Sequence, residues 1–368
     1  MHRSTRIRLF ALAALFALAL TAMAASEYVS SLKSGKAELK SAGALAFGPD
    51  GILLVGDSLG GAVFAIDTGD SKSAQAKPIE IAGLGEKVAA ALGVAADQIL
   101  INDVIVNPLS KRAYLSVSRG RGPDALPVIL RTDSSGKLEE VPMTSVKHAR
   151  VELPNAPSPD AKGRGGALLR AESITDLAYV DGRVFVAGLS SEEFASTLRA
   201  IPFPFRSADK GTAIEIFHGA HGRFETASPV RTFVPYEINK EAHLLAAYTC
   251  TPLVKFPVAQ LKAGAKIMGT TIAELGNRNR PLDMIVYKQG GIDHILMNNS
   301  SRGVMKMSTE KIASFGGITK QTDITGLPYE TIAHLKGVEQ LDKLDDKYGL
   351  ILVRGEGGAL DLKTISLP

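Results

Sequence analysis

Residues 44–68, ALAFGPDGILLVGDSLGGAVFAIDT, contain three short apolar segments separated by two glycine-centred turns. The expected strands are residues 45–47, 52–55 and 62–66. Glycine in the two turns can adopt the positive φ that a tight hairpin connection requires. The stretch therefore predicts a small meander of three antiparallel strands.

The same three-strand plan recurs along the chain. Further copies begin near residues 103, 176, 232, 283 and 339. A sheet meander that repeats every 40 to 60 residues or so is typical of a β-propeller, because one twisted sheet must stack on copies of itself to cover both faces. We therefore expect an all-β, six-bladed β-propeller of four-stranded antiparallel blades. The blade boundaries are expected near residues 80, 150, 225, 275 and 330. A long β-sandwich or a β-solenoid is the alternative.

One helix and one closing strand complete the expected fold. Residues 86–98, EKVAAALGVAADQ, are rich in alanine and have apolar residues at helical spacing. They predict a short surface helix between blades 1 and 2 that caps one face of the ring. Propellers remove their exposed edges by completing the last blade with a strand from the other end of the chain. We expect residues 28–39 to supply that strand.

The N-terminal segment has the pattern of a secretory signal. Arg3, Arg6 and Arg8 precede an apolar run at residues 9–20, and small residues follow it. We expect a signal peptide at residues 1–25 and a single propeller domain at residues 26–368. A transmembrane helix needs about 20 apolar residues, so we expect no membrane span after cleavage and a periplasmic or secreted protein. An uncleaved anchor is the alternative.

Composition excludes several classes of function. The 42 Lys and Arg residues face 38 Asp and Glu residues, and removal of the three signal arginines leaves 39 against 38, a net charge of +1. A nearly neutral domain lacks the concentrated basic face of nucleic-acid binders. The sequence has no Trp and a single Cys, which exclude the WD dipeptide of WD40 blades and haem c attachment. We expect a monomer whose partner is a small molecule or a protein.

Alignment of the six units predicts a site. The residues that begin the first strand of each unit are Ala44, Asp103, Asp176, Arg231, Asp283 and Glu339. The first strand of a propeller blade lines the central channel, so these side chains should meet near one mouth of it. Neutral oxygen donors stand beside two of the aspartates. The expected ligand-binding residues are Asn102, Asp103, Thr175, Asp176, Arg231, Asp283 and Glu339.

Converging carboxylates repel one another, so their pKa values rise or a cation neutralises them. Oxygen ligands suit Ca²⁺, Mg²⁺ or Mn²⁺. Asp103, Asp176 and Asp283 are therefore the candidate ligands of a divalent cation such as Ca²⁺, although no cofactor is certain. Two alternatives stay open. Arg231 could supply the counter-charge, or each aspartate could bond the backbone at the start of its strand.

Two further features could carry chemistry. The pair in His218-Gly219-Ala220-His221 could hold a metal only with help from elsewhere in the chain, and is otherwise a surface loop. The only cysteine, Cys250, lies in a turn and cannot form an intramolecular disulfide. It is either a reactive thiol or a small buried apolar residue.

Two hairpin phrases resemble a known group of propellers. Residues 46–55, AFGPDGILLV, and residues 177–186, LAYVDGRVFV, are similar to the blade phrase of six-bladed NHL and SMP-30/gluconolactonase-like propellers. In the lactonase branch, the resemblance implies a divalent metal at the channel mouth, held by carboxylate and Asn side chains. The first-unit ligand there is a Glu in an E-G-P phrase. This chain has Gly43-Ala44-Leu45 at that place. The resemblance therefore supports the fold more strongly than it supports lactone hydrolysis.

The sequence thus predicts an exported, soluble propeller that binds a ligand or a partner protein through one face of the ring. The alternative is a divalent-metal-dependent hydrolase or lactonase acting at the channel mouth, where a cation would polarise a carbonyl group and activate water. Whether the protein is an enzyme stays open at this stage.

Overall fold

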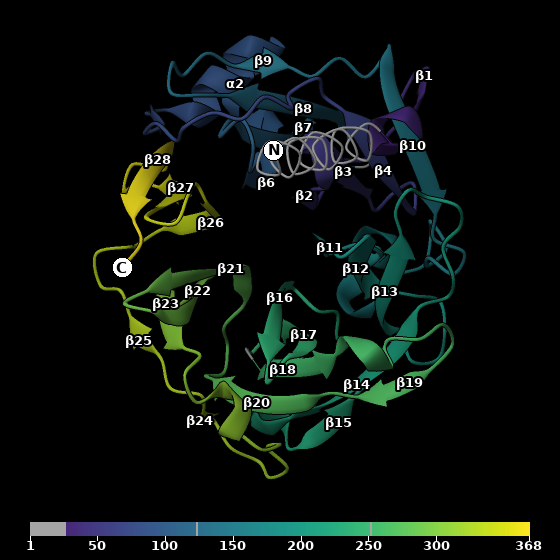
Figure 1. Cartoon of the computed structure of the whole chain (residues 1–368), viewed down its shortest axis with the longest axis vertical. Coiled ribbons are helices and arrows are strands. Elements are labelled where there is room, and N and C mark those ends of the chain that lie inside the picture. Colours follow the sequence, from purple (N-terminus) through teal and green to yellow (C-terminus); the bar gives the residue numbers. More distant parts are fainter. Residues whose placement is uncertain (1–26, 123, 251) are drawn as a thin grey trace, which may run out of the picture.

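A computed structural model describes residues 27–122, 124–250 and 252–368, so the expected signal segment lies outside the described residues. The chain folds into six antiparallel blades around a central channel (Figure 1), which confirms the expected six-bladed β-propeller. The strands of each blade follow one another in this order from the channel outward. Blade 1 consists of β2 (Leu45–Phe47), β3 (Ile52–Asp57), β4 (Ala62–Asp67), β10 (Val146–Glu152) and β1 (Lys33–Gly35). Blade 2 consists of β6 (Ile99–Val106), β7 (Ala113–Arg119), β8 (Leu126–Thr132) and β9 (Glu139–Glu140). Blade 3 consists of β11 (Asp176–Val180), β12 (Arg183–Leu189), β13 (Ser196–Pro202) and β14 (Thr212–His218), and β15 (Arg223–Glu225) and β19 (Lys266–Met268) both pair with β14.

Blade 4 consists of β16 (Thr232–Ile238), β17 (Glu241–Ala247), β18 (Pro252–Pro257), β20 (Thr270–Leu275) and β24 (Ile324–Gly326). Blade 5 consists of β21 (Pro281–Gln289), β22 (Ile292–Asn299), β23 (Gly303–Ser308) and β25 (Glu330–Thr331). Blade 6 consists of β26 (Val338–Lys343), β27 (Tyr348–Arg354), β28 (Leu360–Ser366) and β5 (Glu80–Ile81).

Helical structure is short. Residues 27–30 are α-helical. The further helices of the described chain are α2 (Leu84–Leu92) and the 3₁₀ turns η1 (Pro49–Gly51), η2 (Ala96–Gln98), η3 (Arg164–Gly166), η4 (Leu169–Glu172), η5 (Gly219–His221), η6 (Val258–Gln260) and η7 (Ile312–Ser314). Among the residues that the structure describes, no helix is long and apolar enough to cross a membrane.

The innermost hairpins of blades 1, 3, 4 and 5 turn on pairs of residues with positive φ. These pairs are Asp50-Gly51, Asp181-Gly182, Asn239-Lys240 and Gly290-Gly291. Two consecutive residues with positive φ give the turn whose twist matches that of the flanking strands, and Asp-Gly or Asn-rich sequences adopt it readily. At Gly51, a Cβ atom would also lie 2.6 Å from the Asp70 carbonyl oxygen, so no side chain fits there. The Asp-Gly phrases therefore set the register of the channel-lining strands.

The blades do not follow one another around the ring in sequence order. Blade 2 lies between blades 6 and 1, and blade 1 is flanked on its other side by blade 3 (Figure 1). Apolar clusters fill each junction. Leu115 of blade 2 shares a cluster with Leu350 of blade 6, whereas Ile52 of blade 1 shares one with Val184 of blade 3. The ring order is therefore 1, 3, 4, 5, 6, 2.

Because of this order, two blades receive an outer strand from a distant part of the sequence. After blade 2, the chain returns as β10 to the outer side of β4, where Val151 pairs with Val63. Before blade 2, the chain passes the outer side of blade 6 as β5, where Ile81 pairs with Leu362. The expected boundaries near residues 80 and 150 thus fall on strands that complete other blades.

The expected closing strand was placed wrongly. Within residues 28–39, the structure forms β1, which pairs with β10 at the outer edge of blade 1 and not with the last blade. Blade 6 is completed instead by β5. The segment before α2 runs along the outer edge of blade 6 before the chain enters blade 2, and it pairs there with β28.

The expected helix is present but shorter, and one side of it is buried. It ends at Leu92, where Gly93 adopts the left-handed conformation common after a helix C-terminus. Leu84, Val88 and Ala89 are buried in the same apolar cluster as Leu362 of blade 6. The helix therefore covers the junction between blades 2 and 6.

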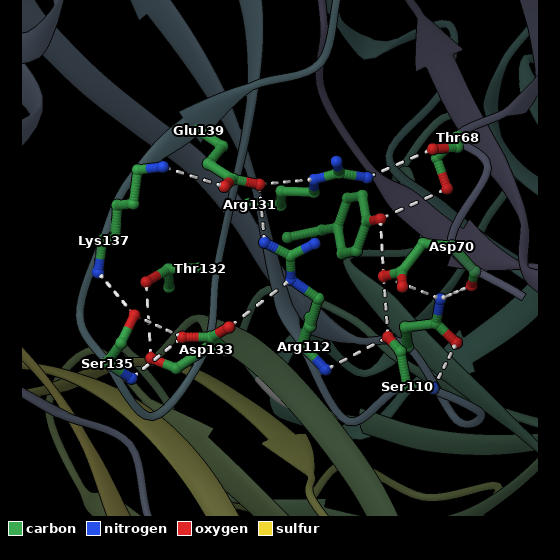
Figure 2. Close-up of polar contacts among 12 residues, drawn as sticks. Thr68, Asp70, Ser110, Arg112, Arg131, Thr132, Asp133, Ser135, Lys137 and Glu139 are labelled. Atoms are coloured by element: carbon green, nitrogen blue, oxygen red, sulfur yellow. Dashed lines mark hydrogen bonds and ion pairs between the residues drawn. The ribbon is translucent and has the colours of Figure 1, made fainter. Parts of the chain in front are cut away.

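A polar network joins blade 2 to the chain that follows β4. Figure 2 shows Arg112 and Arg131 converging on Glu139, whose carboxylate accepts from them at 2.6 and 3.2 Å. The hydrogen bond and the charge of Arg112 lower the pKa of Glu139 to about 2. The Tyr114 hydroxyl donates to Asp70 at 2.9 Å. These contacts fix the outer part of the blade that is out of sequence order.

Candidate functional site in the central channel

The inner strands of all six blades enclose a channel cavity of about 660 Å³. A volume of this size falls within the range of about 300–1,000 Å³ that is usual for small-molecule sites. Six of the seven predicted site residues line the cavity: Asn102, Asp103, Thr175, Asp176, Arg231 and Asp283. Glu339 does not line it.

Each of the three predicted aspartates joins two blades. Every carboxylate accepts the N–H of the next residue in its own strand and a second N–H from the inner strand of the neighbouring blade. The bonds between blades run from Leu45 N–H to Asp103 (2.7 Å), from Phe233 N–H to Asp176 (2.7 Å) and from Leu341 N–H to Asp283 (2.9 Å). The donors in the same strand are Val104, Leu177 and Met284, at 2.8, 2.7 and 2.8 Å. The aspartates therefore do bond the backbone at the start of their strands, one of the two alternatives left open by the sequence.

The aspartates occupy alternate blades of the ring. Blades 2, 3 and 5 carry them, and each is followed around the ring by a blade without one, namely 1, 4 and 6. The residues at the equivalent position in those three blades are Ala44, Thr232 and Gln340. Each aspartate bonds the N–H just after that position. The channel thus has approximate threefold symmetry, in which three carboxylates each serve two strands.

This register corrects the predicted alignment by one residue in two blades. Thr232 begins β16 as Asp176 begins β11, so Arg231 lies one residue before the equivalent position. Glu339 is the extra residue of a β-bulge, and Gln340 holds the equivalent position. A bulge shifts the alternation of side chains locally, and no feature of the single sequence marks it.

Both of these charged residues have partners of their own. An Arg231 Nη1 atom lies 2.6 Å from Glu172 Oε2, and its Nε donates to the Thr249 hydroxyl at 3.2 Å. Glu339 pairs with Arg354 through both carboxylate oxygens, at 2.5 and 3.0 Å. The ion-pair partner of Arg231 is thus Glu172. No direct contact between Arg231 and the aspartates supports the alternative in which Arg231 neutralises them.

The two neutral residues differ in what they can offer. The Asn102 side chain donates to the Ala42 carbonyl at 2.9 Å and to the Ser118 hydroxyl at 3.0 Å, so it fixes the strand ends. The Thr175 hydroxyl is buried and has no hydrogen-bond partner within the described chain. A buried hydroxyl without a partner is unfavourable, and a rotation of the Thr175 side chain would bring this oxygen to a ligand in the channel.

A fourth aspartate was missed by the sequence reasoning. Asp342 lies two residues beyond Gln340 on β26 and lines the same channel. It accepts N–H bonds from Val106 of blade 2 at 2.6 Å and from Lys343 at 2.7 Å. Side chains two residues apart on a strand share a face, so correct alignment of the bulge would have placed Asp342 on the channel face.

The four carboxyl groups have raised pKa values. Burial raises the pKa of Asp103 and Asp176 to about 7 and that of Asp342 to about 6, against the opposing effect of the backbone N–H donors. Burial, then the charge of Asp103, hold the pKa of Asp283 well above its ordinary value. None of the four takes part in an ion pair between described residues. Lys111 and Lys343 also line the cavity, and their charges lower the pKa of Asp342 without forming an ion pair with it.

The predicted metal role of three aspartates finds no support in this arrangement. Ca²⁺ ligands lie about 2.3–2.6 Å from the ion, so oxygens that share an ion must be close together. In the described part of the chain, Asp103, Asp176 and Asp283 do not form a group whose ligand atoms lie within 4.8 Å of one another. Their hydrogen bonds turn each of them toward a different pair of strands. Joint coordination of one ion by these residues stays a prediction.

The segment Gly56-Asp57-Ser58-Leu59-Gly60 has the spacing of a G-x-S-x-G nucleophile motif. The structure gives it another role. The Ser58 hydroxyl is buried and donates to the Ile174 carbonyl at 2.9 Å. Asp57 caps the turn by accepting from the N–H of Gly60 at 2.8 Å. The motif connects two antiparallel strands and not a strand to a helix, so it is a structural turn.

Fold and site together define the class of protein: a six-bladed β-propeller with a ring of aspartates on its channel-lining strands. No known family model matches the sequence, and no curated protein is significantly similar to it. The resemblance to NHL and SMP-30 propellers therefore stays a prediction.

Solved structures with a similar fold are distant in sequence. The native arabinanase of Bacillus subtilis is 12% identical, with a TM-score of 0.37 over 73% of this chain and 94% of that chain. The PQQ-bound aldose sugar dehydrogenase of Streptomyces coelicolor is 10% identical, with a TM-score of 0.36 over 91% and 96%. A putative glucose dehydrogenase of Thermus thermophilus is 13% identical, with a TM-score of 0.36 over 91% and 100%. At TM-scores below 0.5, these similarities say nothing further about this chain.

Proposed function

We propose that this protein is exported and binds a small polar ligand at the mouth of its central channel, through positive charge or hydrogen-bond donors on the ligand. The observation that carries the proposal is the channel of about 660 Å³ lined by four aspartates without ion-pair partners among the described residues. Such an arrangement is unfavourable in isolation and is relieved by a cation or by a ligand with several donor groups.

The chemistry of the aspartates supports this ligand class. Each carboxylate oxygen that accepts one backbone N–H still has a lone pair for a further donor. A positively charged ligand favours the ionised form, so binding to groups with pKa values of about 7 releases protons near neutral pH. The free hydroxyl of Thr175 adds one group that can donate or accept.

Two other functions have less support. A protein-binding face would need a continuous apolar patch, but the exposed large apolar side chains, such as Leu126, Phe224 and Ile292, lie on strands of different blades. A metal-dependent hydrolase at the channel mouth would need several carboxylates around one ion, and the three predicted ligands are not grouped that way. Export rests on residues 1–25, whose pattern is that of a secretory signal.

Thermal unfolding with three classes of probe tests the proposal. Spermidine represents organic cations, glucose represents polyols, and succinate represents dicarboxylates. A ligand that binds only the folded state raises the unfolding temperature by mass action. We expect spermidine or glucose to raise it, and succinate to leave it unchanged because of charge repulsion in the channel.

The matched variants are Asp176→Asn with Asp283→Asn, which change the channel carboxylates, and Asp97→Asn, which changes an exposed aspartate outside the cavity. The double variant should lose the ligand-induced shift, and Asp97→Asn should retain it. A shift with succinate, or no shift with either of the other probes, would contradict the proposal.

A further inference from the structure

A second cluster of polar side chains lies where blades 3 and 4 meet. His218 ends β14, His221 ends η5, and Cys250 lies between β17 and β18 of the next blade. One ligand atom from each of the three residues lies within 4.8 Å of the other two. None of the three lines the channel cavity. Cys250 of the neighbouring blade thus provides the additional side chain that the histidine pair would need for a metal site.

The two histidines are oriented by one carboxylate. Glu225 on β15 receives His218 Nδ1 at 3.0 Å and His221 Nδ1 at 2.7 Å, one on each oxygen. The Ser228 hydroxyl also donates to it at 2.6 Å. A carboxylate can only accept, so both Nδ1 atoms carry the proton and both Nε2 atoms present a lone pair. A carboxylate on the far nitrogen is the arrangement that orients metal-binding histidines.

The Nε2 atom of His218 has no hydrogen-bond partner within the described chain, although this side chain is only 2% exposed. The rings of His218 and His221 lie against each other, with centroids 3.9 Å apart. Buried polar atoms normally have partners, and an orphan commonly marks an ion or a water. This atom is therefore the observation that distinguishes the cluster from a chance grouping of side chains.

We propose that His218, His221 and Cys250 bind a zinc ion that fastens the outer part of blade 3 to blade 4. Imidazole nitrogen and thiolate sulfur are the donors that Zn²⁺ prefers, and three protein ligands leave a fourth position for water. Ca²⁺ and Mg²⁺ take oxygen ligands and are excluded by this donor set. A chain with one cysteine cannot use an intramolecular disulfide, so a metal is the available cross-link.

Metal binding to the purified protein tests the site. The metal-free protein is loaded with Zn²⁺, passed through a desalting column and analysed for zinc by atomic emission. We expect one zinc per chain, a rise in the unfolding temperature, and at least tenfold slower alkylation of Cys250 by iodoacetamide, because a bound thiolate is shielded. Co²⁺ should give the visible absorption of a cobalt–thiolate bond. Ca²⁺ should leave the alkylation rate of Cys250 unchanged.

Four variants separate a metal site from a structural cluster. Cys250→Ser and His221→Ala change partly exposed residues and should abolish stoichiometric zinc. Glu225→Gln should weaken zinc binding by about 10- to 100-fold, the usual effect of losing the carboxylate behind a histidine ligand. His243→Ala is the control, because His243 is also buried near a glutamate but lies outside the cluster. It should bind zinc as the wild type does.

Failure of the wild type to retain zinc, or equal retention by Cys250→Ser, would overturn the proposal. Neither result bears on the channel.

Discussion

An oxygen of the Asp176 carboxylate accepts the backbone N–H of Phe233 at 2.7 Å, although the two residues are 57 positions apart and belong to neighbouring blades. The same carboxylate accepts the N–H of Leu177 through its other oxygen. One side chain thus accepts hydrogen bonds from the backbone near the start of two channel-lining strands, β11 and β16. The lining of the channel and the geometry of its acidic groups are therefore the same feature of the molecule.

Asp176→Asn should destabilise the fold modestly. The amide nitrogen cannot accept a hydrogen bond, so one backbone N–H loses its partner, at a cost of about 1–3 kcal/mol. Removal of a buried charge offsets part of this cost, so we expect a loss of about 1 kcal/mol in the free energy of unfolding, measured by urea denaturation at neutral pH. Asp346→Asn, at an exposed position, is the control and should change little. An equal effect in both variants would mean that the bond between blades contributes nothing.

The raised pKa values predict how stability depends on pH. Asp103 and Asp176 bind protons more tightly in the folded state, where their pKa is about 7, than in the unfolded state, where it is about 3.8. Their contribution is complete below the unfolded pKa and is lost as pH rises through the folded pKa. We therefore expect the protein to be more stable at about pH 5.5 than at about pH 8. The variant with Asn at both positions should show a smaller difference. Stability that rises over this interval would contradict the raised pKa values.

Phe185→Ala tests the junction between blades 3 and 4. Phe185 on β12 is 1% exposed and belongs to the same apolar cluster as Phe256 of blade 4. Truncation of a core aromatic residue leaves a cavity, so we expect a loss of about 3–5 kcal/mol in the free energy of unfolding. Phe224→Ala is the control, since Phe224 is 52% exposed and should cost far less. A loss below roughly 1 kcal/mol for Phe185→Ala would place that ring outside the core.

Glu139→Gln tests the network of Figure 2. The charge on Glu139 is held by Arg112 and Arg131, and its loss should lower stability by about 1 kcal/mol at neutral pH, after allowance for screening by solvent. Because its folded pKa is about 2, this contribution is present above the ordinary pKa of 4.5 and is lost as pH falls toward 2. The difference between wild type and variant should therefore shrink in acid. Glu38→Gln, at a side chain 74% exposed and paired with Lys36, should show no such pattern.

Much of the fold is predictable because it is local. The phrase at residues 44–68 forms β2, β3 and β4 as expected, since Asp50 and Gly51 adopt the turn that their types favour. Position on the inner strands likewise placed Asp103, Asp176 and Asp283 in one channel. Periodicity and turn chemistry act over a few residues, so one sequence is enough to reveal them.

The parts that the sequence could not predict depend on distant partners. The position of blade 2 in the ring depends on whether Ile81 pairs with a strand of blade 6 or with a strand close to it in sequence. The residues around Ile81 do not decide between these two pairings. The bulge at Glu339 moves the register by one residue without any local sign. The cluster of His218 and Cys250 joins two loops of different blades, so only the packing of those blades brings them together.

The position of blade 2 also sets the order in which the ring can be assembled. Ile81 and α2 are synthesised long before Leu350 and Leu362, the side chains that cover them. Until the C-terminal strands emerge, one apolar flank of blade 2 has no neighbour, and such surfaces favour aggregation. A chain truncated before β28 should therefore leave this flank of blade 2 exposed. Blade 6 thus stabilises a segment that is synthesised long before it.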